Sequence, residues 1–143
     1  MRTFTAEAEI DRIGHGLIAR DLPKSEWTHA AHFAAAFWLL RRRGELDAVH
    51  VMSELIRAYN ESTGVANTET SGYHHTITVA SLRAARAWLA ARAGMPLPEA
   101  LNGLLEREYG RSDWLLEYWS RARLFSVEAR RSWVDPDLKE LPF

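Results

Sequence analysis

The sequence has 143 residues, of which 47% are hydrophobic and 26% are charged, a balance typical of a globular domain rather than of a disordered, collagen-like or transmembrane chain. The formal net charge of −1 gives no general attraction for nucleic acid or for an anionic membrane. Because the chain contains no cysteine, disulfides, thiolate metal sites and a cysteine nucleophile are excluded. Any metal would have to be held by histidine, carboxylate or water.

The apolar segments of the chain do not suggest export or membrane insertion. The N-terminal segment 1–13 carries acidic residues and lacks the apolar stretch of a signal peptide. The longest apolar run, 30–40, is interrupted by His32 and is too short to span a bilayer. We therefore expect a cytoplasmic protein with no membrane partner.

Apolar residues recur at helical spacing along most of the chain, which predicts an all-α fold. We expect a single domain, 1–143, built as a bundle of about six to seven helices with an extended C-terminal tail. Capping residues, glycines and prolines place the helices at 5–20, 25–43, 47–62, 70–93, 98–109, 112–119 and 126–133, and the tail at 137–143. The β-branched run 76–79 leaves a short strand as the alternative there, but the alanine-rich continuation favours a helix.

The second and fourth of these helices are expected to be the central ones. The second is apolar on nearly all sides, as in a buried helix, and Ser25 is its expected N-cap. Thr70 or Ser71 is the expected N-cap of the fourth. Four of the six histidines of the chain lie in these two helices, where a polar group without a partner would be costly.

The spacing of these histidines predicts a metal site. In a helix His29 and His32 share a face, about 60° apart in rotation and roughly 4.5 Å apart along the axis, which allows both to bind one ion. His74 and His75 are about 100° apart, so only one of them easily faces a given neighbour. We predict that His29, His32 and His74 hold a divalent metal, with water in the open position of a catalytic site. The sequence does not distinguish zinc, iron, nickel and copper.

The function favoured by this pattern is a small metal-dependent enzyme whose site lies between the two central helices, with its reaction unspecified. In this hypothesis His75 is a metal ligand or general base, and Tyr73 and Thr78 position the substrate. The polar loop 65–71 is expected to form the rim of the pocket.

Three further residues are assigned to substrate binding. Trp27 is expected to line the pocket beside the first pair of histidines. Arg123 and Ser126 lie at a predicted helix start, where a guanidinium and free backbone N–H groups favour a carboxylate or a phosphate; surface ion pairing is the alternative role of this arginine. The expected partner is a small-molecule ligand or substrate, and self-association into a homo-oligomer is left open.

Two other functions use the same residues. The chain could be a non-catalytic helical module that binds a small ligand, or a metal-free enzyme in which a buried histidine is the general acid or base. The histidines could also be purely structural and satisfy one another or backbone groups. No nucleophile elbow, glycine-rich phosphate loop or DNA-reading module is present.

Four short motifs resemble an uncharacterised family of small bacterial helical proteins. They are WTHxAH at 27–32, YHxTIT at 73–78, SRxRLxS at 120–126 and PDLxxLP at 136–142. The resemblance covers nearly the full length and implies a helical fold, but it brings no established activity. His75 stands where members of that family tend to have glutamate, which makes His74 the stronger candidate for a shared role.

Overall fold

The structure is a computed structural model that describes residues 2–143, apart from the side chain of Glu45. Within this range the chain forms seven α-helices, three short 3-10 turns and no strand, which confirms the predicted all-α fold. The α-helices are α1 (Glu7–Ala19), α2 (His29–Arg42), α3 (Glu45–Ser62), α4 (His75–Ala90), α5 (Leu97–Leu105), α6 (Arg121–Leu124) and α7 (Val127–Arg131). The 3-10 turns are η1 (Lys24–Glu26), η2 (Glu108–Gly110) and η3 (Trp114–Glu117).

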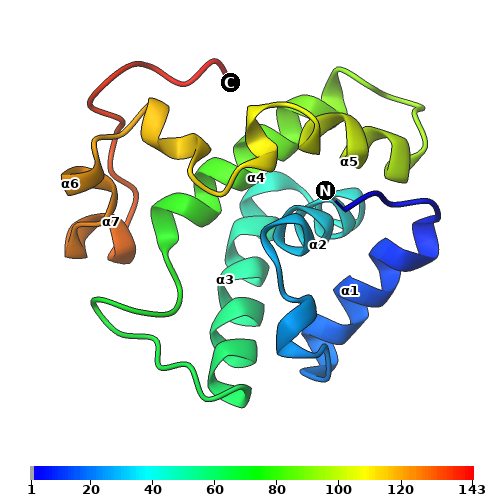
Figure 1. Cartoon of the computed structure of the whole chain (residues 1–143), viewed down its shortest axis with the longest axis horizontal. Helices are drawn as coiled ribbons and strands as arrows, with labels where there is room; N and C mark the ends of the chain where they lie inside the picture. The colour runs from blue at the N-terminus through cyan, green and yellow to red at the C-terminus, as the bar shows by residue number, and fades with distance from the viewer. Residues whose placement is uncertain (1) are drawn as a thin grey trace.

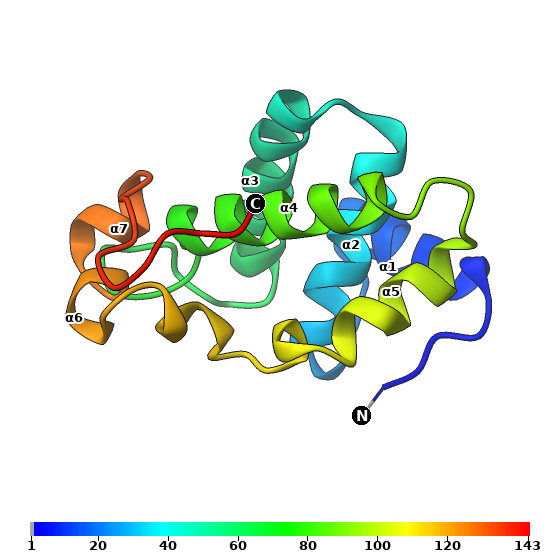
Figure 2. The same ribbon diagram turned by 90° about the horizontal axis from the view of Figure 1, so that it is seen from above.

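The helices α2 and α4 lie at the centre of the fold, as predicted. The helix α2 packs against α1, α3, α4 and α5, and α4 packs against α2, α3, α5 and α7. Figures 1 and 2 show α4 running through the middle of the molecule, with α1 and α5 towards one end and α6 and α7 at the other. In α2, every residue from Ala31 to Leu39 is buried except His32. His32 is therefore the accessible side chain of this otherwise buried segment.

The N-cap of α2 lies three residues after the predicted one. Residues 24–26 form the separate turn η1, and Thr28 caps α2 by accepting a hydrogen bond of 3.2 Å from the backbone N–H of Ala31. The prediction of Ser25 as the cap is therefore wrong. Both residue types are good N-caps, and tertiary packing selects between them. As a result His29 is the first residue of α2 rather than an internal one.

The helix α4 also begins later than predicted. The hydroxyl oxygen of Thr68 accepts from the backbone N–H groups of Thr70 and Ser71, and the Ser71 hydroxyl donates to the carbonyl of Ala66. The loop therefore uses its own hydroxyl groups, and neither Thr70 nor Ser71 caps α4. The ring of His74 takes this role.

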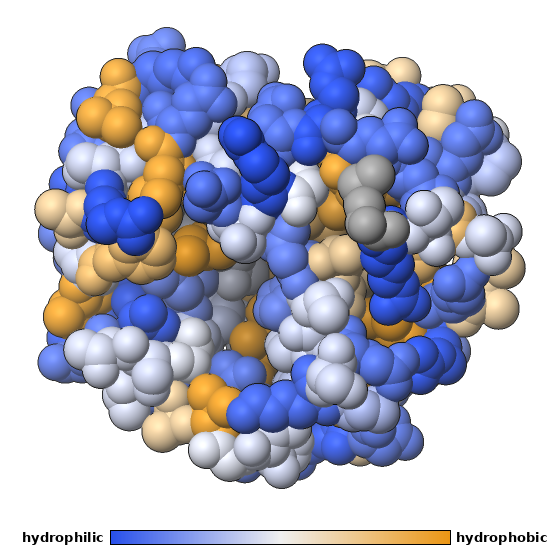
Figure 3. Space-filling model, in the orientation of Figure 1, coloured by the Kyte–Doolittle hydropathy of each residue, from blue (hydrophilic) through white to orange (hydrophobic). Residues whose placement is uncertain are grey.

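The C-terminal part of the chain is less helical than predicted. The segment expected to form a sixth helix contains only η3, followed by the short helices α6 and α7. The tail after residue 136 has no helix, and the backbone N–H of Leu138 donates to the carbonyl of Tyr118 at 2.9 Å. Side chains with large apolar area are exposed here at Phe125, Val127 and Leu138. On the face seen in Figure 3, apolar surface lies mainly on this side of the molecule.

None of the helices within residues 2–143 has both the length and the apolar character needed to cross a bilayer.

Candidate functional site

A cavity of about 280 Å³ lies between α2, α3, α4 and η3, and we call it the histidine cavity. Most of its wall is apolar and includes Phe33, Met52, Leu82 and Leu115. The polar side chains in its wall are His29, His32, Thr78, Ser81 and Ser112. A small apolar cavity with a few polar groups is the usual form of a small-molecule site.

His32 is held in one orientation at the wall of this cavity. Its Nδ1–H donates to the carbonyl of Thr28 at 2.7 Å, and its ring stacks on Trp27 with 3.8 Å between centroids and 29° between planes. Because Nδ1 carries the proton in this arrangement, Nε2 has a free lone pair. His32 is exposed whereas its neighbours on α2 are buried, and it lines the cavity.

The surroundings of His32 keep it neutral. Burial among other residues lowers its pKa to about 4, the Thr28 carbonyl opposes this change, and the nearby His29 adds slightly to it. At neutral pH the ring therefore offers an acceptor nitrogen to the cavity rather than a positive charge.

His29 lies one helical turn before His32 and faces the same cavity. Its Nε2–H donates to the carbonyl of Tyr109 at 2.7 Å, and the ring makes an edge contact with Phe33 at 5.4 Å between centroids. Its Nδ1 is then the unprotonated nitrogen. Both histidines therefore donate one N–H to a backbone carbonyl and keep the other nitrogen free, and both line the same cavity.

A second cavity of about 350 Å³ adjoins the first, and we call it the loop cavity. The two share four lining residues, which are His32, Ile56, Ile77 and Thr78. Trp27, Tyr73 and His74 line the loop cavity and not the histidine cavity. Val65, the first residue of the predicted rim loop, and Gly72, which directly follows this loop, also line the loop cavity. His32 and Thr78 therefore stand between two connected spaces.

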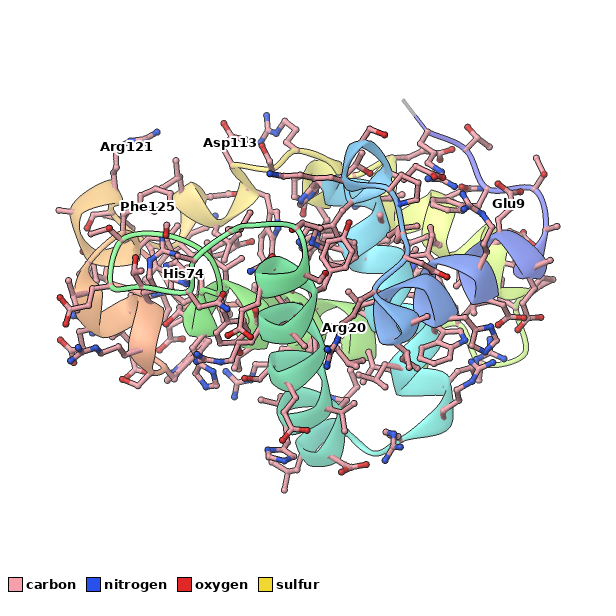
Figure 4. All side chains as sticks on the ribbon, turned by 90° about the horizontal axis from the view of Figure 1, so that it is seen from below. Glu9, Arg20, His74, Asp113, Arg121 and Phe125 are labelled. Carbon is pink, nitrogen blue, oxygen red and sulfur yellow. The ribbon has the colours of Figure 1, made fainter. Side chains whose placement is uncertain are left out.

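Both ring nitrogens of His74 are bonded to the backbone. Nδ1 accepts from the N–H of Ile77 at 3.2 Å, and Nε2–H donates to the carbonyl of Leu124 at 2.7 Å. The residue is 7% exposed, and Figure 4 shows it beside Phe125, whose ring centroid lies 6.4 Å away. Burial lowers the pKa of His74, with a smaller contribution from Arg130. A metal could bind His74 only by replacing one of these two hydrogen bonds.

The residues assigned to catalysis are only partly brought together. The Tyr73 hydroxyl and the His75 Nδ1 share a hydrogen bond of 2.9 Å, but His75 lines neither cavity. Thr78 lines both cavities and donates its hydroxyl hydrogen to the carbonyl of His74 at 2.9 Å. Burial lowers the pKa of His75, and Arg57 lowers it further. The pair formed by Tyr73 and His75 thus lies outside the histidine cavity.

Arg123 and Ser126 have local structural roles and line neither cavity. The Arg123 Nε donates to the carbonyl of Asp135 at 2.6 Å. The Ser126 hydroxyl oxygen accepts from the N–H of Ala129 at 3.1 Å and so caps α7. Among the residues assigned to substrate binding, Trp27 alone lines a cavity described above.

The donor groups near the histidine cavity are fewer than the metal hypothesis expects. Within residues 2–143, no three side chains of the types His, Cys, Asp and Glu are grouped so that they could hold one ion. His29 and His32 each keep a free nitrogen, whereas His74 does not. The metal site therefore stays a prediction that rests on two protein ligands.

Sequence reasoning missed several residues of the cavity. Ser81 lies three residues after Thr78 in α4, so the helical period could have placed both hydroxyl groups on one face. Ser112 and the Tyr109 carbonyl have no such signal, because they approach from a distant part of the chain.

Comparison with known proteins adds no further constraint. No protein-family model matches the chain, and neither a curated protein nor a solved structure matches it significantly. The family resemblance of the four motifs therefore stays a prediction, and the function has to be argued from the cavity itself.

Proposed function

We propose that the chain binds a small, largely apolar organic molecule in the histidine cavity, and that this molecule donates a hydrogen bond to Nε2 of His32. The observation that carries the proposal is a neutral histidine with one free acceptor nitrogen in a mostly apolar wall. The volume of about 280 Å³ is near the lower end of the usual range for ligand pockets, about 300–1,000 Å³. This favours a compact ligand, such as a single ring with a hydroxyl or N–H group.

Binding is favoured over proton abstraction by His32. A general base works best when its pKa lies near the working pH, whereas the pKa of this ring is about 4. The ring is therefore a weak base that still accepts a hydrogen bond. The hydroxyl groups of Thr78, Ser81 and Ser112 supply further polar partners along the wall.

The test compares two probes of nearly equal shape, phenol and toluene, of which phenol alone can donate a hydrogen bond. Binding can be followed by tryptophan fluorescence, because Trp27 stacks on the ring of His32, to which the ligand is proposed to bind. We expect the parent to bind phenol about fivefold to tenfold more tightly than toluene, the effect of about 1 kcal/mol for one hydrogen bond. His32→Leu should remove this preference.

The matched control is His50→Leu, because His50 is an exposed residue of α3 that pairs with Glu54 and lines neither cavity. This variant should keep the preference for phenol. The proposal fails if neither probe binds to saturation, or if His32→Leu retains the same preference as the parent.

A metal-dependent function is the second candidate, and one observation favours it. Histidines that bind metals usually donate their other N–H to a carbonyl or carboxylate, and both His29 and His32 do so. In this proposal the remaining positions are filled by water or by a donor atom of the substrate, which would leave the ion open for catalysis.

Titration of tag-free protein with Zn²⁺ or Co²⁺ tests this candidate. We expect one equivalent of metal to bind, with binding lost in both His29→Gln and His32→Gln and kept in His50→Gln. His74→Asn should also keep the metal, because the His74 ring nitrogens are engaged elsewhere. Equal binding by the parent and by His32→Gln would rule this site out.

A further inference from the structure

A separate pocket of about 220 Å³ lies between α3, the loop that follows α3, and α7, and we call it the arginine pocket. Three guanidinium groups line it, from Arg57, Arg130 and Arg131, together with the carboxylate of Glu69. Arg57 and Glu69 belong to α3 and the loop after it, whereas Arg130 and Arg131 come from α7, far along the sequence. Their convergence on one pocket is therefore a result of the fold.

Arg57 is oriented without the help of a carboxylate. Its guanidinium carbon lies 4.5 Å from the ring centroid of Tyr73, and its Nε donates to the Ser53 hydroxyl at 3.4 Å. In the described part of the chain Arg57 forms no ion pair. Stacking on an aromatic ring fixes the plane of the guanidinium and leaves N–H groups at its edge for another acceptor.

Arg130 is held in a similar way by backbone carbonyls. One of its terminal nitrogens, Nη1, donates to the carbonyls of Gly72 at 2.9 Å and Tyr73 at 3.4 Å. These neutral acceptors do not cancel its charge, and no ion pair of Arg130 is found among the described residues. Arg131 pairs with Glu69, so that the charges of these two side chains offset each other. The pocket keeps the positive charges of Arg57 and Arg130.

The other polar groups of the pocket are already used within the protein. The Asn67 side-chain oxygen accepts from the backbone N–H of Tyr73, and its amide nitrogen donates to the carbonyl of Arg57. The Thr68 hydroxyl oxygen accepts two backbone N–H groups of its own loop. The groups of the pocket that still lack a charged partner are therefore the guanidinium groups of Arg57 and Arg130. Guanidinium groups bind anionic acceptors well when two oxygens are presented together.

We propose that the arginine pocket binds an oxyanion group, a phosphate or a carboxylate, of a small molecule. Arg57 and Arg130 supply the charge and the N–H donors, while Tyr73 and the Gly72 carbonyl hold them in place. The two arginines are fixed before the anion arrives, which lowers the entropy lost on binding. This proposal is independent of the ligand of the histidine cavity.

The experiment titrates ¹⁵N-labelled protein with inorganic phosphate and, separately, with acetate at low ionic strength, and follows the amide signals by NMR. We expect saturation by at least one of the two anions, with the largest shifts at Gly72 and Tyr73. Arg57→Gln should weaken this binding by tenfold or more. Preference for phosphate or for acetate identifies which oxyanion the pocket suits.

The matched control is Arg41→Gln, which makes the same change of charge in α2, a helix that contributes nothing to the pocket. It should alter the affinity by less than twofold. Arg130→Gln is a second test variant, and its anion affinity is measured only if the variant protein stays folded. The proposal is wrong if neither anion saturates, or if Arg41→Gln weakens binding as much as Arg57→Gln does.

Discussion

His74 provides the sharpest test of the structure, because its ring joins the start of α4 to the end of α6. Replacing it with alanine removes the N-cap of α4, a loss of about 1 kcal/mol. It also leaves the buried carbonyl of Leu124 without its partner, which costs about 1–3 kcal/mol. We therefore expect His74→Ala to lower the free energy of unfolding by roughly 2–4 kcal/mol, a large part of the total stability of about 5–15 kcal/mol for a typical domain.

A second variant separates the two bonds. The side chain of asparagine can still cap a helix but is too short to replace the imidazole at Leu124, so His74→Asn should cost about 1 kcal/mol less than His74→Ala. Urea unfolding followed by circular dichroism measures both changes. His50→Ala, an exposed change in α3, should stay within about 0.5 kcal/mol of the parent. A loss of less than about 1 kcal/mol in His74→Ala would refute the assigned role.

Two further predictions concern pH and close packing. The pKa of His32 is lowered from 6.5 to about 4 on folding, so the unfolded chain takes up the proton first, and stability should fall as the pH drops from about 6.5 to 4. If the ring were fully buried, the free energy of unfolding would fall by about 3 kcal/mol over this range, and the exposure of the ring reduces the expected fall to about 1–2 kcal/mol. This fall should be absent in His32→Leu when urea midpoints at pH 7 and pH 4 are compared, and an equal pH dependence in both proteins contradicts the prediction. In Gly110→Ala the new Cβ would lie 1.9 Å from the carbonyl oxygen of Leu105. We therefore expect the free energy of unfolding, measured by thermal unfolding, to fall by about 2–3 kcal/mol. Phenol binding should also weaken, because η2 contains Tyr109, whose carbonyl accepts from His29. In Gly44→Ala the new Cβ has nothing within 4 Å, so only the change of the N-cap residue of α3 should be felt, a loss of about 0.5 kcal/mol. A similar loss in both glycine variants would refute the clash.

The sequence predicted the parts of the fold that depend on local periodicity. The central positions of α2 and α4 followed from their apolar residues, and the three-residue spacing of His29 and His32 placed both on one face, where the structure has them lining one cavity. The start of α2 was missed because Ser25 and Thr28 are both suitable caps, and local propensity does not choose between them.

The parts that were missed depend on contacts between distant residues. The hydrogen bond from His74 to the Leu124 carbonyl was not predicted, because the two residues are 50 positions apart in the sequence. Histidine is also an unusual N-cap, so the local sequence gave no sign of this role. The arginine pocket is lined by residues 57, 67 and 130, and no spacing in the sequence predicts that these residues lie close together.

The hydrogen bond between His29 and the Tyr109 carbonyl determines when the histidine cavity forms during folding. The two residues are 80 positions apart, and Ser112 and Leu115 close the same cavity from the later segment. During synthesis, a chain that has emerged only as far as α5 has both histidines but neither the carbonyl that orients one of them nor the wall opposite. If the histidine cavity binds the proposed ligand, binding is therefore acquired only after this late segment has docked, and a bound ligand then reports that folding has passed that point.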